Sequence, residues 1–313
     1  MADCAVISDQ VLSFVMRNLA EGSVEPGPEE HEVRKLVVWY KLDPKAAKTT
    51  GCSEIGNAKA ILSLRSENPD RLLYICRSGI ILTYDLKKDA VVQEAPIYKA
   101  AEGPGNYFQV TGARNVNGRA YVLGPDGTVL LRHGPGRWDS ISVEKNTGDD
   151  RLLVDIDGFA ADDLYAVSSR GSVFHYNGQS WSDTGFPSNI SLESLCCAGD
   201  GQVYIGAAQG TVFRGRGQRW EKIHDGSLTL PFRDMVWHQG QVWCTNDFGL
   251  WVIRGGQLAP AEVERDIYVC SGHLSVHENT LLLAGMYGAA ILREGRWEAL
   301  FYQPEFIEEG ARG

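Results

Sequence analysis

The sequence predicts an all-β protein that repeats one unit of short antiparallel strands along almost its whole length. In the clearest copy, residues 162–181, Val173, His175 and Asn177 alternate with their neighbours at the two-residue period of a strand. Asn177-Gly178 then gives a strong hairpin signal, because a type I′ turn needs positive φ at both central positions. Glycine-closed turns and aromatic residues repeat this pattern at nearly constant intervals. These observations favour a repeat architecture, because one such meander cannot bury both of its faces alone.

The period of the repeat follows from two sets of residues. The glycines that close the turn after the second strand are 48, 44, 39, 39 and 39 residues apart. They are Gly79, Gly127, Gly171, Gly210, Gly249 and Gly288. The aromatic residues after the third strand keep similar intervals, and they are Trp138, Trp181, Trp220 and Trp297. In the gap between the last two, Leu258 takes the tryptophan position. A regular period of about 40 residues is typical of propellers and arrays.

This pattern resembles the repeat of a β-propeller, in which each blade is a four-stranded sheet. Neither the Trp-Asp dipeptide of WD40 repeats nor the double glycine of kelch repeats recurs from blade to blade, and the blades look like those of many bacterial propellers. The resemblance covers nearly the whole chain, but it identifies no functional family. A β-sandwich is the alternative fold.

We expect one domain over residues 1–313 with seven blades of four antiparallel strands. Six blades with an N-terminal extension are the alternative. The expected blades span about residues 3–57, 58–98, 107–143, 152–186, 192–225, 232–263 and 268–303.

The first blade is the least regular. Its expected strands are Cys4–Ile7, Val11–Met16 and Lys35–Leu42, and an acidic loop insertion with five glutamates occupies residues 18–34. Residues 304–313 are expected to form a flexible tail. Within it, Phe306-Ile307 is the single candidate for a strand that completes blade one. The sequence therefore leaves open how the ring closes.

Net charge, the N-terminal residues and the cysteines indicate which partners and which cellular compartment to expect. The formal net charge of −10 argues against nucleic acid and anionic membranes as partners, and it suits a monomer that meets a basic protein. The first ten residues lack the positive region and apolar core of a signal peptide. The seven cysteines are expected to be reduced, mostly buried thiols. We therefore expect a cytoplasmic protein.

The search for chemistry finds no complete motif, so no catalytic residue, metal or cofactor is predicted. G-x-S-x-G does not occur. His273 and His277 are four residues apart on a predicted strand, where their side chains would not share a helix face. The segment from Asp155 to Gly158 looks like the start of a calcium loop, but the twelfth position is Ala166 instead of Glu. Asp163 and His175 are expected to serve a strand and a turn of their blade.

Propeller geometry places the turns after the second strands and the blade-to-blade connections on one face. This face carries the insertion, and rigidly held loops rich in aromatic residues and arginine favour binding. The partner-binding candidates are Glu29, Glu30, Arg77, Tyr107, Phe108, Asp126, Arg170, Phe232, Arg233, Asp247, Phe248, Tyr268 and Tyr287. For Phe108 and Phe232, packing at a blade junction is the alternative.

Three functions remain open. The first is a non-enzymatic, protein-binding scaffold, with a bacterial immunity protein that neutralises a toxin as the specific hypothesis. The second is a hydrolase or lyase at the central channel mouth. Its candidate residues lie on or near the first strands of their blades, and they are Asp155, Asp157, Glu193, Arg233, Asp234 and His273. The third is a small-ligand sensor without turnover.

Overall fold

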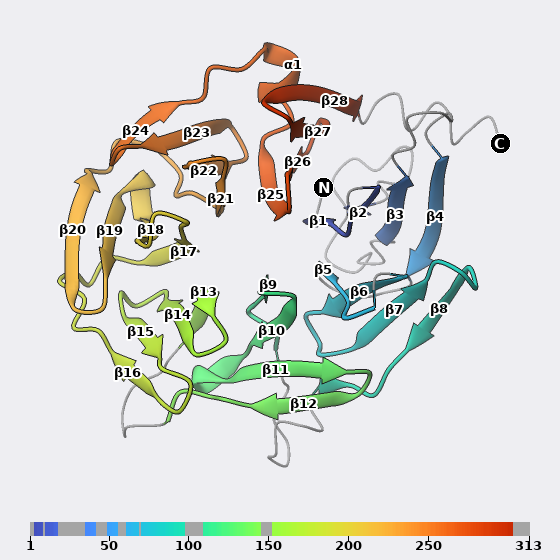
Figure 1. The fold of residues 1–313 in the computed structure, drawn as a ribbon, viewed down its shortest axis with the longest axis horizontal. Helices are drawn as coiled ribbons and strands as arrows, with labels where there is room; N and C mark the ends of the chain where they lie inside the picture. The colour runs from blue at the N-terminus through green and yellow to red at the C-terminus, as the bar shows by residue number, and fades with distance from the viewer. Residues whose placement is uncertain are drawn as a thin grey trace, which may run out of the picture.

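The computed structural model describes residues 3–8, 10–17, 35–41, 49–55, 61–68, 70–97, 109–144 and 152–302. Over these ranges the chain forms seven four-stranded antiparallel sheets, which stand around a central axis like the blades of a propeller (Figure 1). The predicted all-β propeller of four-stranded antiparallel sheets is confirmed. Six sheets come from β5–β28, and the N-terminal strands β1–β4 pair as a sheet of their own.

Each sheet contains four strands that are consecutive in the sequence. The first two are β1 (Asp3–Val6), β2 (Val11–Arg17), β3 (Lys35–Lys41) and β4 (Thr49–Ile55), then β5 (Ile61–Arg65), β6 (Arg71–Cys76), β7 (Ile81–Asp85) and β8 (Ala90–Gln93). The third and fourth are β9 (Gly112–Val116), β10 (Arg119–Leu123), β11 (Val129–Gly134) and β12 (Arg137–Ser140), then β13 (Leu153–Ala160), β14 (Asp163–Ser168), β15 (Val173–Tyr176) and β16 (Trp181–Asp183).

The remaining three sheets follow the same order. They are β17 (Leu192–Cys197), β18 (Val203–Ala207), β19 (Val212–Arg216) and β20 (Arg219–His224), then β21 (Asp234–His238), β22 (Gln241–Asn246), β23 (Gly249–Arg254) and β24 (Gln257–Pro260), and finally β25 (Gly272–His277), β26 (Thr280–Gly285), β27 (Gly288–Arg293) and β28 (Arg296–Tyr302). A short helix, α1 (Arg265–Tyr268), lies in the connection between the last two sheets.

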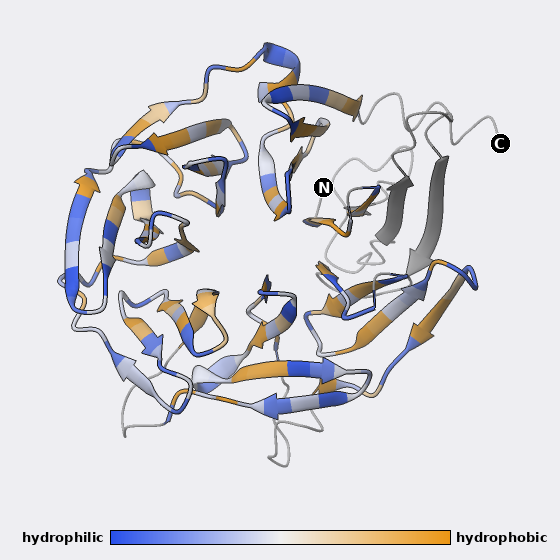
Figure 2. Cartoon of the chain, viewed as in Figure 1, coloured by the Kyte–Doolittle hydropathy of each residue, from blue (hydrophilic) through white to orange (hydrophobic). Residues whose placement is uncertain are grey.

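Strand composition follows each strand's place in the ring. The second strands β18, β22 and β26 are buried along their whole length, because neighbouring sheets cover both of their faces. The fourth strands β12 and β20 are largely exposed, and Figure 2 shows hydrophilic residues along them at the rim. The first strand of each sheet borders the central axis (Figure 1). Side chains on these inner strands therefore converge on the channel.

Seven apolar clusters fill the seven junctions between neighbouring sheets. The cluster between the first and last sheets closes the ring, and there Phe14 meets Phe301 edge to face with ring centroids 5.3 Å apart. The backbone amide of Val6 in β1 donates a hydrogen bond of 2.9 Å to Ser275 Oγ in β25. Because all seven sheets are built from consecutive strands, the ring closes by side-chain packing and needs no exchanged strand. Phe306-Ile307 lies outside the described residues.

The acidic insertion at 18–34 and the tail at 304–313 also lie outside the described residues. The six cysteines whose side chains are described are all free thiols, and five of them are buried. Burial raises the pKa of the Cys244 thiol well above its usual range. These thiols therefore behave as small apolar side chains within the sheets.

Candidate functional site

The turns after the second strands and the connections between sheets touch one another, and we call this side of the ring the connection face. The amide of Val110, in the connection to β9, donates to the carbonyl of Arg77 at 2.8 Å. The amide of Leu228, in the connection to β21, donates to the carbonyl of Gln209 at 3.0 Å. These bonds fix the described turns against the described parts of the connections.

The structure brings five of the partner-binding candidates together at the last two sheets. Arg233 Nη2 donates to Asp247 Oδ2 at 2.5 Å, and Asp247 is followed in the β22–β23 turn by Phe248, which is 75% exposed. Tyr268, which ends α1, donates from its hydroxyl to the Phe248 carbonyl at 2.8 Å. Tyr287 lies in the neighbouring β26–β27 turn and is 57% exposed.

The other exposed candidates lie apart from this group. Arg77, Asp126 and Arg170 occupy the equivalent turns of the second, third and fourth sheets, and all three are exposed. Asp126 adopts a left-handed φ of 56°, which turns the chain within the short 3-10 helix 125–127. These residues share a face with the five but form no common cluster with them. Glu29, Glu30, Tyr107 and Phe108 lie outside the described residues.

Phe232 takes the alternative place, at a blade junction, and is not part of the exposed surface. Its side chain is 0% exposed and packs edge to face on Trp251, with ring centroids 5.2 Å apart. The residue belongs to the apolar cluster between the fifth and sixth sheets, so it cannot touch a partner. Phe232 directly precedes the exposed Arg233 in the connection to β21, which suggested that it would lie on the connection face. A large apolar ring instead favours the buried side of such a connection.

One exposed residue beside this group was not predicted. Met286 directly precedes Tyr287 in the β26–β27 turn and is 61% exposed. Within the described residues, Phe248, Tyr268, Met286 and Tyr287 make up four of the seven large apolar side chains that are exposed. An apolar residue at a turn tip between two glycines was the signal in the sequence. We call these four residues the apolar patch.

The central channel holds a second concentration of functional groups. A cavity of about 680 Å³ is lined by all six residues that were predicted to converge at the channel mouth. At its middle, the Arg114 guanidinium reaches Asp155 Oδ2 at 3.2 Å, Asp234 Oδ1 at 3.1 Å and Asp157 Oδ2 at 3.6 Å. Arg114 also donates to the Leu195 carbonyl at 2.9 Å. No motif in the sequence marks the central place of Arg114, because an arginine on a short inner strand looks like any other strand residue.

The same carboxylates bind the sheets to one another. Asp155 accepts a hydrogen bond from the Leu195 amide at 2.8 Å, and Asp157 accepts one from the Cys197 amide at 2.8 Å. Asp234 accepts from the Leu274 amide at 3.1 Å. In each case the acceptor lies on one inner strand and the amide on the next. These bonds satisfy backbone donors that the sheet ladders leave free at the channel wall.

Burial governs the protonation of these groups. Desolvation raises the pKa of Asp155 to about 7, and the nearby carboxylates of Asp234 and Asp157 add to the rise, although Arg114 opposes it. Desolvation likewise raises the pKa of Asp3, which also borders the cavity, to about 7. The pKa of His273 falls to about 3, because the ring is buried and the positive charge of Arg233 lies beside it. One guanidinium therefore serves more carboxylates than it can neutralise.

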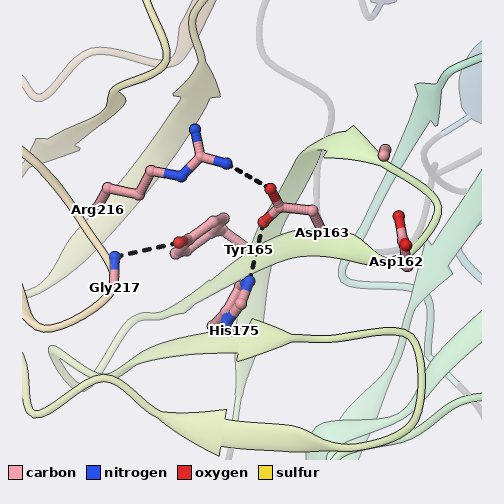
Figure 3. A pocket seen from close by; sticks show the side chains of 7 residues that line it. Asp162, Asp163, Tyr165, His175, Arg216 and Gly217 are labelled. Carbon is pink, nitrogen blue, oxygen red and sulfur yellow. Dashed lines mark hydrogen bonds and ion pairs between the residues drawn. The ribbon is translucent and has the colours of Figure 1, made fainter.

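A further pocket lies where the fourth and fifth sheets meet, on the face of the ring opposite the connection face (Figure 3). Asp163 accepts from Arg216 Nη2 at 2.5 Å and lies 2.9 Å from His175 Nε2. The Gly217 amide donates to the Tyr165 hydroxyl at 3.1 Å. The polar groups of this pocket thus pair with one another across the sheet junction, in keeping with the expected structural role of Asp163 and His175.

In chemical terms, the connection face offers an apolar contact surface, and the channel offers a buried network of charges. Among the described residues, no group of three or more histidine, cysteine or acidic side chains is placed to hold a metal ion. The described part of the chain has no helix long and apolar enough to cross a membrane.

No family model matches the sequence. Over 186 residues, the chain is 28% identical to Immune protein Tsi7 of Pseudomonas aeruginosa. The match covers 58% of this chain and 60% of Tsi7, so the chain spans less than two thirds of the length of this curated relative.

Solved structures share the fold at lower identity. PorZ, a surface component of the type-IX secretion system of Porphyromonas gingivalis, matches 85% of this chain and 36% of its own length, with a TM-score of 0.56 and 16% identity. YCF48 from Cyanidioschyzon merolae matches 76% of this chain and 83% of its own, with a TM-score of 0.52 and 14% identity. The fold and these neighbours define the chain as a β-propeller.

Proposed function

We propose that this protein is a bacterial immunity protein, which neutralises a toxin by binding it through the connection face. The similarity to Immune protein Tsi7 is the observation that carries the proposal. It supports a protein toxin as the partner, since the name of the relative describes protection. The same proposal places the protein in the cytoplasm as a monomer that meets its toxin there.

The surface chemistry supports a role in protein binding. A rigid ring presents aromatic side chains on short turns, and such residues contribute large contact area at a small cost in conformational entropy. Phe248 and Tyr287 are held at adjacent turns and lie largely in solvent. Exposed apolar side chains gathered on one face of a soluble protein mark interaction sites. The predicted contacts of Glu29, Glu30, Tyr107 and Phe108 are part of this proposal.

The test is a protection assay. Each protein encoded beside this gene in its source genome is expressed in a bacterial host, alone and together with the propeller. For the cognate toxin, co-expression is expected to restore colony formation, and the two proteins should co-purify as a complex. If every neighbouring protein that inhibits growth did so equally in the presence of the propeller, at matched expression, the proposal would be wrong.

A hydrolase or lyase at the channel is the second candidate, because the six predicted residues do line one cavity. The carboxylates Asp155, Asp157 and Asp234 are, however, engaged by Arg114 and by backbone amides. A structural role accounts for those bonds without a substrate. Protection of the host by an Asp155→Asn variant as complete as that by the wild type would favour the binding function over the enzyme.

A further inference from the structure

The apolar patch is continuous with the rim of the channel. Arg233 borders the cavity and pairs with Asp247, and Phe248 follows Asp247 in the same turn. The Tyr268 hydroxyl binds the Phe248 carbonyl, which ties the connection to that turn. Contacts thus lead from the cavity wall to the exposed ring of Phe248 without an interruption.

The second half of the patch is fixed to the first by close backbone packing. A Cβ atom at Gly285 would lie 1.8 Å from the Ser271 carbonyl oxygen, so only glycine allows the β26–β27 turn to approach the connection. The Ser271 hydroxyl donates to the Tyr268 carbonyl at 2.6 Å. Met286 and Tyr287 follow Gly285 directly, so the connection at 268–271 joins both turns. The patch is therefore preorganised, which lowers the entropic cost of binding.

The cavity beside the patch is lined by more carboxyl groups than arginines. Its lining contains six carboxylates but three arginines. The carboxylates are Asp3, Asp155, Asp157, Glu193, Asp234 and Glu278, and the arginines are Arg65, Arg114 and Arg233. Arg114 is shared by three aspartates, and Arg233 pairs with Asp247 outside the cavity. The formal charge of the whole chain is −10 as well.

From this juxtaposition we infer that the toxin partner docks an apolar segment on Phe248, Tyr268, Met286 and Tyr287 and extends one arginine or lysine side chain into the channel mouth. This inference rests on the proposed function and specifies its interface. Glu193 is the charged group at the mouth that a cation would meet, since its carboxylate is held by a 2.8 Å bond from Ser191 Oγ and by no arginine or lysine among the described residues. Apolar contact supplies affinity, and the buried charge sets the orientation.

The charge argues against a second copy of this chain as the occupant of the patch. Two molecules that meet at this face would bring two acidic cavities and two net negative charges together, and like charges at an interface oppose association. A partner with a basic contact surface is attracted by the same negative charge. The long apolar stem of an arginine or lysine also lets its charged end reach into a cavity while the stem contacts apolar neighbours.

Binding of the purified cognate toxin by full-length variants tests the inference. Phe248→Ala and Tyr287→Ala are each expected to raise the dissociation constant about 30-fold, as for aromatic residues at the centre of an interface. Val92→Ala is the matched control, because Val92 is 51% exposed on the outer strand β8 and lies in the second sheet. This control should change the constant less than about twofold.

The charge is tested by isosteric substitution. Glu193→Gln keeps the acceptor for Ser191 and removes one negative charge, so it should slow association and flatten the dependence of affinity on salt. Glu221→Gln removes one negative charge from the outer strand β20 and should leave the salt dependence unchanged. Unfolding curves of all the variants confirm that each remains folded.

The outcomes separate the two proposals. Unchanged affinity in both patch variants, with the toxin still bound, overturns the inferred interface and leaves the immunity function standing. Loss of affinity in the patch variants together with an unchanged salt dependence in Glu193→Gln overturns the cation at the mouth. If the wild type binds no toxin but dimerises through Phe248, both the function and the inferred partner are wrong.

Discussion

Arg114 shows how one residue can hold several elements at once. Its guanidinium joins aspartates from β13 and β21 and also binds the carbonyl of Leu195 in β17. Three carboxylates share this one positive charge, so at least one of them gains free energy by binding a proton. Burial raises the pKa of Asp155 to about 7; of the charged groups that face it, Arg114 opposes the rise, and Asp234 and Asp157 add to it.

Asp155→Asn should change how stability depends on pH. The folded-state pKa of Asp155 lies above its unfolded value, so this residue favours folding at low pH and loses that contribution as pH rises towards about 7. The free energy of unfolding of the variant, relative to the wild type, should therefore rise between pH 5 and pH 8. Urea titrations at several pH values measure this difference.

Asn115→Ser provides the control for that measurement. Asn115 lies on an inner strand and accepts a hydrogen bond from the Arg65 amide at 2.7 Å, but its amide does not titrate. The variant should lose stability by a similar amount at every pH. If the Asp155→Asn difference were equally flat, the carboxyl would have the same pKa in the folded and unfolded states.

The limits of sequence analysis at the residue scale are illustrated by three positions. The six channel candidates line one cavity because the first strands of all the sheets border the central axis of a propeller. The repeat alone was enough to predict this arrangement. Arg114 could not be found in this way, since its importance depends on the distances to side chains from other sheets. Phe232 was misplaced because alternation along the strand does not extend into the irregular connection that precedes it.

At the scale of elements, the second and third sheets are joined by a buried group of ion pairs between Arg132, Glu67 and Glu94, which we call the ionic clasp. Arg132 in β11 is 4% exposed and binds two glutamates of the second sheet. Its guanidinium donates to both carboxylate oxygens of Glu94 at 2.8 Å and to Glu67 Oε2 at 2.9 Å. Glu94 Oε2 also accepts a bond from the Gly136 amide at 3.0 Å. The clasp therefore connects β8, the β5–β6 turn and β11.

Arg132→Met should lower the free energy of unfolding by about 3 kcal/mol, because it leaves the buried carboxylate of Glu94 without its partner. Arg214→Met is the matched control, since Arg214 forms a more exposed pair with Glu221 within the fifth sheet. That pair should contribute less than about 1 kcal/mol. Chemical denaturation of the two variants gives both values. Equal losses would show that burial does not distinguish the two arginines.

The elements themselves were largely predictable. Turn glycines recur every 39 residues over the last four sheets, because each sheet must repeat the same strand and turn lengths to pack on its neighbour. The clasp could not be predicted, since Glu67, Glu94 and Arg132 come from segments with no shared motif. The apolar patch was found in part, from aromatic residues on turns. Met286 was missed although it lies at a turn tip between two glycines, because the exposure of a single methionine depends on how the turn packs.

For the whole molecule, the seam between the first and last sheets decides whether the ring stays closed. Phe14 and Phe301 meet there, together with apolar residues of β1, β26 and β27. The sequence left ring closure open because packing between distant segments has no local pattern. The structure resolves it through complementary apolar faces on β2 and β27.

A double-mutant cycle on Phe14 and Phe301 measures the strength of the seam. Phe301→Ala should lower the free energy of unfolding by about 3 kcal/mol through the lost burial and the cavity left behind. The two single losses should exceed the double loss by about 1 kcal/mol, which is the coupling expected of an edge-to-face pair. Phe14 and Phe174, which lie in different clusters, should show additive losses. Additivity in the first pair as well would mean that the rings do not stabilise each other.

The consecutive order of strands in every sheet also determines how the molecule would respond to mechanical force. Unzipping a sheet requires its ladder of backbone bonds to break, whereas parting β1 from β25 requires apolar side chains to separate and the bond from Val6 to Ser275 to break. Under tension across the seam, the ring should open there first into a curved array of intact sheets. Single-molecule stretching would then record a small initial extension, followed by steps in which individual sheets unravel.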